Sequence, residues 1–154
     1  MNIIKRILLY INKCVVMEPT YKIYDPCNRG KNVSIGEGTK IGAFCELGDG
    51  VIIGENCNIQ AFVYIPSNVI IMDDVFIGPS VIFTNDKYPP SKGKWKNDPP
   101  TIVKSSSIIG AGSIIMPNLV IGYKSVIGAG SLVTKNIPSN ELWYGNPARF
   151  VKDV

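Results

Sequence analysis

Residues 33–83 read VSIGEGTKIGAFCELGDGVIIGENCNIQAFVYIPSNVIIMDDVFIGPSVIF, and this stretch repeats with a period of six. A large apolar residue recurs at every sixth position: Ile35, Ile41, Leu47, Ile53, Ile59, Ile65, Ile71, Ile77 and Phe83. A smaller residue stands two positions before each of them: Val33, Thr39, Cys45, Val51, Cys57, Val63, Val69, Val75 and Val81. Positions two apart on an extended strand point to the same side. Each hexad therefore supplies one small and one large inward side chain.

A bend follows each pair of inward residues. Glycine often stands directly after the large residue, where the missing Cβ lets the backbone turn tightly: Gly36, Gly42, Gly48, Gly54 and Gly78. A six-residue unit cannot bury its apolar edge alone, so successive units must stack into a solenoid with one continuous core. The repeat therefore predicts an all-β fold, a parallel β-helix.

The pattern stops after Phe83 and resumes twenty residues later at Val103, fourteen residues beyond the next expected position. The large positions are then Val103, Ile109, Ile115, Ile121, Ile127 and Val133, and the small ones Thr101, Ser107, Ser113, Leu119, Ser125 and Ser131. With three hexads per turn, the fifteen hexads predict about five coils, roughly 25 Å long. We expect a single domain, residues 1–154: a cap and connector over 1–31, coils over 32–83 and 101–138, an extruded loop over 84–100 and a tail over 139–154.

Composition narrows the possible functions. The net charge of +4 and the pI of about 8.9 are modest, and the basic residues lack the interleaved aromatic residues of an RNA-binding sheet, so we expect no nucleic-acid partner. Cys45 and Cys57 occupy small inward positions and are expected to be buried, reduced thiols. No cysteine pair has CxxC spacing and there are no histidines, so no metal site is predicted.

The N-terminal stretch 1–17 is mostly apolar, with Lys5, Arg6 and Lys13. Its apolar run, residues 7–11, is too short for a signal peptide, and no small-residue cleavage site follows it. We expect a short amphipathic helix that caps the open end of the solenoid, and a cytoplasmic protein. Loose membrane association through the same helix is the less favoured alternative.

The extruded loop begins with Thr84, Asn85 and Asp86, directly after a coil. A rigid scaffold thus presents polar side chains at the root of a long loop, and binding and catalytic residues tend to be placed at such sites. An ordinary solenoid excursion is the competing interpretation of the prolines and lysines that follow.

The small and large alternation with glycine after the aliphatic residue resembles the repeat of the left-handed β-helix (hexapeptide-repeat) acyltransferases. The resemblance covers residues 32–149. It implies a left-handed coil, a homotrimer with sites between subunits, and acetyl-CoA as cosubstrate.

A second resemblance is narrower. Gly78 and Pro79, followed by Val-Ile-Phe-Thr-Asn-Asp-Lys-Tyr-Pro over 81–89, resemble a signature of the N-acetyltransferases that modify 3-amino sugars linked to dTDP or UDP for surface polysaccharides. One position departs from this pattern, because Pro90 stands where the family has arginine. Any phosphate or sugar contact of that arginine would fall to Lys87 or Lys92.

The absence of histidine separates two chemistries. Hexapeptide-repeat enzymes that acetylate hydroxyl groups resemble one another in using a histidine base, because a hydroxyl must lose its proton during attack. The carbonic anhydrases of this fold need three histidines for zinc. An amine with a pKa near 8 is already about one-tenth neutral at pH 7 and needs no strong base. The sequence therefore favours an amine acceptor.

The resemblance implies roles for particular residues. Asn85 would hydrogen-bond the sugar amine, as the catalytic residue, and the substrate-binding residues would be Asn85, Asp86, Lys87 and Tyr88. A backbone N–H within 110–113 would bind the thioester oxygen. The acetyl-CoA-binding residues would be Gly110, Ala111, Ser113, Ala129, Gly130, Lys135, Asn146, Pro147 and Arg149. For the glycine- and alanine-rich corners, and for the turn at 145–147, a purely structural role is the alternative.

Two functional interpretations remain open from the sequence. The favoured one is an N-acetyltransferase for a dTDP-linked 3-amino-3,6-dideoxyhexose, with a UDP-linked 3-amino uronic acid as the alternative substrate. The other is a non-catalytic trimeric β-helix that serves as a binding or assembly module, supported by the missing arginine and the lack of a conventional base.

Overall fold

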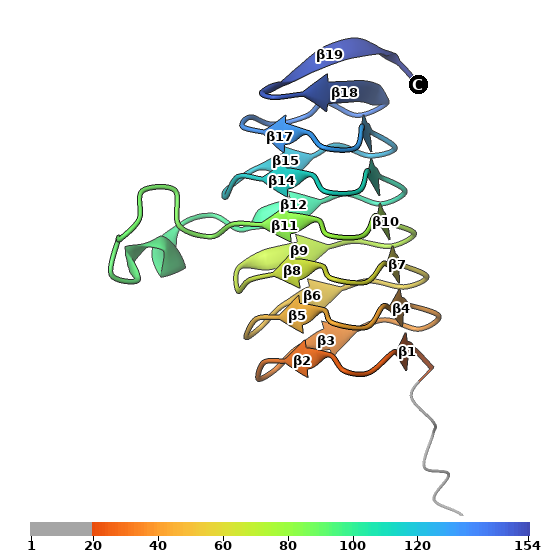
Figure 1. Ribbon diagram of the computed structural model, residues 1–154, viewed down its shortest axis with the longest axis vertical. Helices are drawn as coiled ribbons and strands as arrows, with labels where there is room; N and C mark the ends of the chain where they lie inside the picture. The colour runs from red at the N-terminus through yellow and green to blue at the C-terminus, as the bar shows by residue number, and fades with distance from the viewer. Residues whose placement is uncertain (1–19) are drawn as a thin grey trace, which may run out of the picture.

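Three sheets, parallel except for the antiparallel last strand of the chain, form the sides of a prism, and the chain visits them in turn (Figure 1). The computed structural model describes residues 20–154. Sheet A contains β1 (Lys22–Ile23), β4 (Lys40–Ile41), β7 (Asn58–Ile59), β10 (Phe76–Ile77), β13 (Ile108–Ile109), β16 (Val126–Ile127), β18 (Glu141–Gly145) and β19 (Ala148–Asp153). Sheet B contains β2 (Asn28–Arg29), β5 (Glu46–Leu47), β8 (Tyr64–Ile65), β11 (Ile82–Phe83), β14 (Ile114–Ile115) and β17 (Leu132–Val133). Sheet C contains β3 (Ser34–Ile35), β6 (Ile52–Ile53), β9 (Val69–Ile71), β12 (Thr101–Val103) and β15 (Val120–Ile121).

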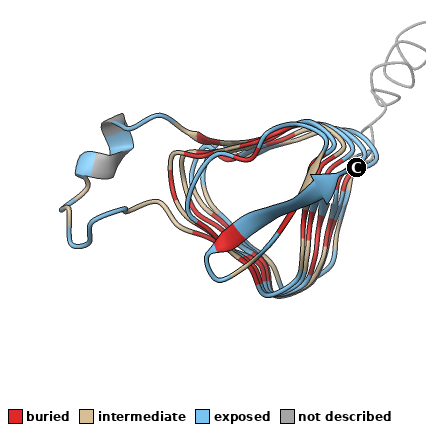
Figure 2. Cartoon of the chain, turned by 90° about the horizontal axis from the view of Figure 1, so that it is seen from above, coloured by how far each residue is buried: buried red, intermediate tan, exposed pale blue. Residues whose placement is uncertain are grey.

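The register confirms three hexads per turn and the size of the insertion. Ile41 pairs with Ile59 and Ile53 with Ile71, eighteen residues apart in each case. Across the loop, Ile77 pairs with Ile109, thirty-two residues on, which is one turn plus fourteen residues. The extruded loop leaves one corner of the prism (Figure 2) and carries a single 3-10 turn, η1 (Lys94–Asn97). Within residues 20–154, no helix is long and apolar enough to cross a membrane.

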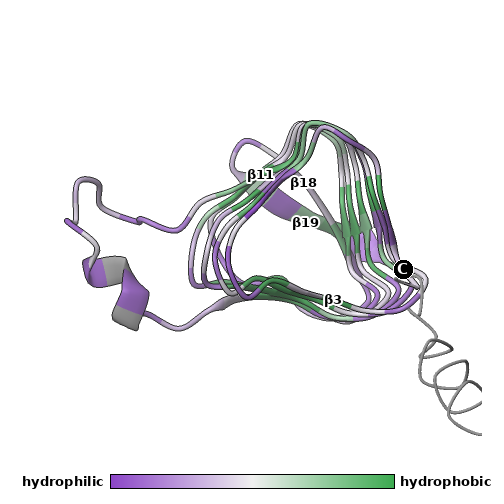
Figure 3. Ribbon diagram, turned by 90° about the horizontal axis from the view of Figure 1, so that it is seen from below, coloured by the Kyte–Doolittle hydropathy of each residue, from purple (hydrophilic) through white to green (hydrophobic). Residues whose placement is uncertain are grey.

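The predicted inward positions form the core. Each large residue of the repeat from Ile41 to Val133 is at most 1% exposed. Hydrophobic residues line the three faces, whereas the loop is largely hydrophilic (Figure 3). The Cys45 and Cys57 thiols are buried and reduced as expected, and they donate to the carbonyls of Gln60 and Met72 at 3.1 and 3.0 Å. Burial raises the pKa of both thiols, so they remain protonated.

We refer to the corners of the prism by the sheets that they join. The A–B edge carries the turns 42–44, 60–62, 78–80, 110–112 and 128–130; the B–C edge carries the loop and the turns 66–68, 116–118 and 134–136; the C–A edge carries the turns 54–56, 72–74, 104–106 and 122–124. Each edge is therefore a ladder of equivalent positions on successive coils.

The expectation of about five coils was too low, because sheet A holds seven parallel strands and the solenoid has about seven turns. Two departures from the strict period hid the extra coils. Arg29 takes the large position of β2, and Ile137 follows Val133 after four residues instead of six, pairing with Ile121. Trp143 then enters the core opposite Ile127. The predicted N-terminal cap helix falls on residues 1–19, outside the described residues.

Replacing Ile115 by alanine is expected to lower the free energy of unfolding by about 2–5 kcal/mol, because its side chain is fully buried and leaves a cavity. Its neighbour Ile114 points outward and is 38% exposed, so Ile114→Ala is the matched control, with an effect of about 0.5 kcal/mol or less. Denaturant titration of both variants checks this. Equal losses in the two variants would contradict the assignment of inward and outward positions.

Candidate functional site

Both ends of the extruded loop are fixed to the coils. On the outgoing side, the Thr84 N–H and hydroxyl both donate to the carbonyl of Ile115, at 3.0 and 3.1 Å. On the returning side, the Asn68 amide donates to the carbonyls of Asp98 and Pro99, and the Asn118 amide donates to Pro99 at 2.6 Å. Asn68 lies on the coil before the loop and Asn118 on the coil after it. The loop is therefore held from both sides, and residue 85 occupies a defined place at the B–C edge.

Asn85 is half-buried, directly after the fixed Thr84. Among the described residues, its side-chain amide takes part in no hydrogen bond. An amide carries two N–H donors and a carbonyl acceptor. A rigidly placed and unengaged amide suits recognition of an amine or hydroxyl group.

Asp86 turns toward the loop itself. Its Oδ2 accepts the Ser91 N–H at 2.9 Å and its Oδ1 accepts the Tyr88 N–H at 3.1 Å. The hydrogen bond from Ser91 is the main reason that the pKa of the Asp86 carboxyl lies below its usual range, and the bond from Tyr88 adds to it. Both carboxylate oxygens of Asp86 therefore accept hydrogen bonds that stabilise the loop. The sugar contact expected of Asp86 stays a prediction.

The hydrogen bonds to Asp86 depend on its ionisation. Since the folded-state pKa is lowered, they are in place above the ordinary aspartate pKa of about 3.9 and are lost as the pH falls through the lower folded value. We expect the amide proton signals of Tyr88 and Ser91 to shift together, with a midpoint below the ordinary aspartate value. In Asp86→Asn this titration should vanish. A midpoint at or above the ordinary value would contradict the capping role.

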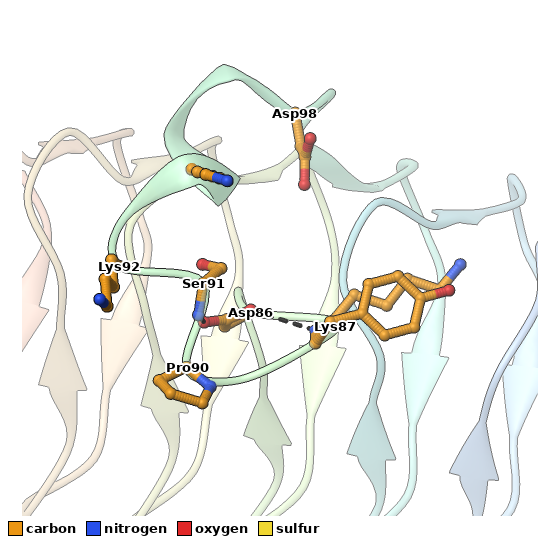
Figure 4. A pocket seen from close by; sticks show the side chains of 8 residues that line it. Asp86, Lys87, Pro90, Ser91, Lys92 and Asp98 are labelled. Carbon is orange, nitrogen blue, oxygen red and sulfur yellow. Dashed lines mark hydrogen bonds between the residues drawn. The ribbon is translucent and has the colours of Figure 1, made fainter.

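The loop encloses a cavity of about 500 Å³ on its concave side (Figure 4). Three lysines, two aspartates and three further residues line it: Asp86, Lys87, Tyr88, Pro90, Ser91, Lys92, Lys94 and Asp98. The Ser91 hydroxyl oxygen is buried without a hydrogen-bond partner. Lys87 Nζ lies 5.6 Å from the centre of the Tyr88 ring. With the Asp86 charge engaged by backbone donors, the cavity presents a surplus of cationic side chains and suits an anionic group.

Sequence reasoning placed Lys87 and Tyr88 at the site but missed Ser91, Lys94 and the clamp formed by Asn68 and Asn118. Lys92 and Lys94, two residues apart in the sequence, are the local pattern that indicates the cavity. The clamp depends on the loop folding back on the prism, and no local pattern reveals that. No group of three side chains suited to hold a metal occurs within residues 20–154.

The second group of predicted residues stacks along the A–B edge. Gly110 and Ala111 lie one coil below Ala129, and Gly130 N donates to the Ala111 carbonyl at 2.8 Å. The turn with Asn146 and Pro147 follows on the next level, where Gly145 N donates to the Ser131 hydroxyl at 3.2 Å. Within the described residues, the Ala111 N–H has no acceptor. This N–H is free to donate to a ligand oxygen, and the expected role of a donor within 110–113 stays a prediction.

Two further predicted residues lie in the core or on another edge, and a third lies on β19. The Ser113 side chain is fully buried and its hydroxyl donates to the Gly128 carbonyl at 3.1 Å, so its side chain belongs to the core. Lys135 lies on the B–C edge, where its Nζ is 4.8 Å from the centre of the Trp143 ring. Arg149 is exposed on β19, opposite Tyr144, and its guanidinium donates to the Ala148 carbonyl.

Within one chain, Asn85 and the Ala111 corner lie on different edges. The width of sheet B separates them, about 15 Å for the extended part of a hexad. Two edges of the same prism, so far apart, do not close around one reacting centre.

Family comparison agrees with this architecture. The family described as bacterial transferase hexapeptide (six repeats) matches residues 32–67 and 50–85, and the hexapeptide repeat of succinyl-transferase matches residues 100–135. Together the matches span more than half of the chain, which belongs to the hexapeptide-repeat acyltransferases. The class predicted from the repeat is thereby confirmed.

Solved structures narrow the comparison further. A variant of AntD, an N-acyltransferase from Bacillus cereus in complex with dTDP and coenzyme A, is 28% identical, with 86% of this chain and 82% of that chain covered and a TM-score of 0.74. A hexapeptide transferase family protein from Anaplasma phagocytophilum is 27% identical, with coverages of 87% and 79% and a TM-score of 0.65. A hexapeptide-repeat acetyltransferase from Vibrio cholerae, complexed with acetyl coenzyme A, is 25% identical, with coverages of 82% and 70% and a TM-score of 0.60. No protein of curated function matches the chain significantly in sequence.

Proposed function

We propose that the protein transfers the acetyl group of acetyl-CoA to the 3-amino group of a nucleotide-linked amino sugar, with a dTDP-linked 3-amino-3,6-dideoxyhexose as the favoured substrate. The observation that carries the proposal is the unengaged Asn85 amide, held at the fixed root of a loop whose cavity is cationic. The likeness to an N-acyltransferase that holds dTDP and coenzyme A supports it. The reaction would take place in the cytoplasm and would supply a sugar for the synthesis of surface polysaccharides.

The chemistry needs no histidine. The neutral amine attacks the thioester carbonyl, the N–C bond forms, the C–S bond breaks, and the proton released from nitrogen passes to the departing sulfur, giving an amide and free CoA thiol. Reaching the neutral amine from a pKa near 8 costs about 1.4 kcal/mol at pH 7. Asn85 orients the amine, and the Ala111 N–H stabilises the developing charge on the thioester oxygen.

Assembly would complete the site. In a threefold assembly, one edge of each prism lies at the axis. The two sheets that meet at this edge contact the two neighbouring copies. If sheet A of one copy packs on sheet C of the next, the C–A edges lie at the axis, and the A–B edge of one copy meets the loop of the other. Any arrangement that uses sheet B puts the A–B edge or the loop at the axis. We therefore propose a homotrimer of left-handed coils joined through sheets A and C.

The outer faces of sheets A and C fit this interface. Sheet A presents Phe76 and Ile108, and sheet C presents Ile52, with Ile70 and Ile102 partly buried beside it. Exposed aliphatic rows of this kind gain free energy when a neighbour covers them. In such a shared site, acetyl-CoA bound by the predicted residues of the A–B edge would lie next to the amine that Asn85 of the neighbouring copy holds.

The lysines of the loop cavity would take the place of the absent arginine at position 90. A diphosphate carries two or more negative charges, and Lys87, Lys92 and Lys94 offer it flexible point charges. The same surplus of cations also suits the carboxylate of a sugar acid, so a UDP-linked 3-amino uronic acid remains the second candidate substrate.

The deciding experiment is a thiol-release assay with acetyl-CoA and a panel of dTDP- and UDP-linked 3-amino sugars. Turnover with one dTDP-linked sugar, well above the rate of acetyl-CoA hydrolysis, is the expected result. Turnover with the uronic acid alone would move the substrate to the second candidate. If the folded protein releases no thiol with any sugar of the panel, the proposed function fails and a binding or assembly role takes its place.

A further inference from the structure

Two phenylalanines form an exposed aromatic ladder on the A–B edge. Phe44 and Phe62 occupy equivalent turn positions on successive coils, and their rings lie parallel, with centroids 5.0 Å apart and planes 4° apart. They are 57% and 58% exposed. Core packing within the chain therefore does not account for either ring.

The backbone at both positions makes these residues unexpected. Phe44 has a φ of 59° and Phe62 a φ of 62°, in the left-handed region that bulky side chains rarely adopt. The equivalent positions on the coils above hold Ser80, Gly112 and Gly130, which suit a tight turn better. Strained residues of this kind persist mainly where a site uses them.

The surroundings leave the ladder open at both ends. Below it, a cavity of about 440 Å³ is lined by Pro26, Cys27, Asn28, Phe44, Cys45 and Glu46. Above Phe62 comes Ser80, whose small side chain ends the ladder of rings. A flat heteroaromatic ring that lies against Phe62 would continue it.

The proposed function places such a ring at this level. The predicted CoA residues of the A–B edge lie on the coils above Pro79, toward the C-terminus, so a sugar whose amine meets Asn85 must extend its nucleotide toward the N-terminal coils. The loop runs the same way, since Lys96 lines a cavity of about 290 Å³ with Asp49, Ser67 and Asn68 of the coils below (Figure 1). In the proposed trimer this loop faces the neighbour's A–B edge, where Phe62 lies one coil below Pro79.

We propose that Phe62, supported by Phe44, is the stacking platform for the nucleobase of the nucleotide-linked sugar. This inference rests on the proposed function and adds the residues that hold the far end of the substrate. Base–aromatic stacking tolerates different bases because every base has a flat π-face. The platform alone therefore accepts thymine and uracil alike.

The test measures binding of dTDP and UDP to the full chain by isothermal titration calorimetry, with acetyl-CoA titrated in parallel. The variant is Phe62→Asn, because asparagine tolerates a left-handed φ and stands at such turn positions elsewhere in this chain, as in Asn56 and Asn68. It therefore removes the ring without adding strain. Phe62→Tyr keeps the ring and is the matched control.

We expect Phe62→Asn to weaken dTDP binding by roughly tenfold or more, while its acetyl-CoA affinity and oligomeric state stay unchanged. Phe62→Tyr should bind dTDP like the wild type. Unchanged dTDP affinity in Phe62→Asn overturns the platform and leaves the proposed function standing. A selective loss of acetyl-CoA affinity, or dissociation of the oligomer, also overturns it in favour of a CoA contact or a subunit contact. A wild-type protein that binds neither nucleotide overturns the substrate class itself.

Discussion

Asn85→Ala is expected to lower kcat/KM for the amino sugar by about a hundredfold, because removal of a single positioning or charge-stabilising group in a preorganised site has effects of this size. The fold should be unaffected, since the Asn85 side chain bonds to no other described residue. The thiol-release assay measures the loss, and the KM for acetyl-CoA should change little.

The matched control is Asn140→Gly, which removes another exposed asparagine near the C-terminal end of the prism. Its φ of 60° is one that glycine adopts freely. Full activity in Asn85→Ala would remove Asn85 from the mechanism. A rise in the KM for the sugar at constant kcat would reduce its role to binding.

Ile108→Asp is expected to dissociate the oligomer and to abolish most acetyl transfer, a loss of a hundredfold or more. Ile108 is 43% exposed on the outer face of sheet A, and the proposed interface buries it. A buried, unpaired carboxylate costs several kcal/mol at each of the interfaces of the assembly. Ile52→Asp, on sheet C, should behave in the same way.

Ile82→Asp is the matched control, because Ile82 is 42% exposed on sheet B, which faces solvent in the proposed trimer. Sedimentation velocity gives the oligomeric state of each variant, and the thiol-release assay gives its activity. If Ile82→Asp dissociates the oligomer while Ile108→Asp stays assembled, sheet B forms the interface, and the arrangement that joins the two edges is wrong.

Most of the prism could be predicted from the sequence because the inward positions obey a strict period. Ile41 and Ile59 are eighteen residues apart and pair in the structure. The terminal coils escaped prediction where the period fails, with Arg29 in a large position and a two-residue shortening before Ile137. At these positions, pairing with the neighbouring coil determines the extended conformation, and the local sequence pattern does not.

The candidate site was predictable in part. The root of the loop followed from the interrupted repeat, and Asn85 and Asp86 are placed there. The direction of the Asp86 carboxylate did not follow, because it depends on where the Ser91 and Tyr88 N–H groups come to lie. Ser113 was assigned both an inward position and a place beside the CoA arm, and burial of its side chain favours the first. Lys135 lies on the B–C edge, one corner away from the Asn146 turn.

The two ends of the loop, at Thr84 and Pro100, connect strands that stack in register with the coils above and below. The inserted segment can therefore vary independently of the prism, since removal of fourteen of its residues would restore the six-residue spacing between Phe83 and Val103. Doubling the length of a flexible loop costs only about 0.6 kcal/mol of closure entropy. The length and sequence of this segment can thus change while the stacked coils of the prism stay the same.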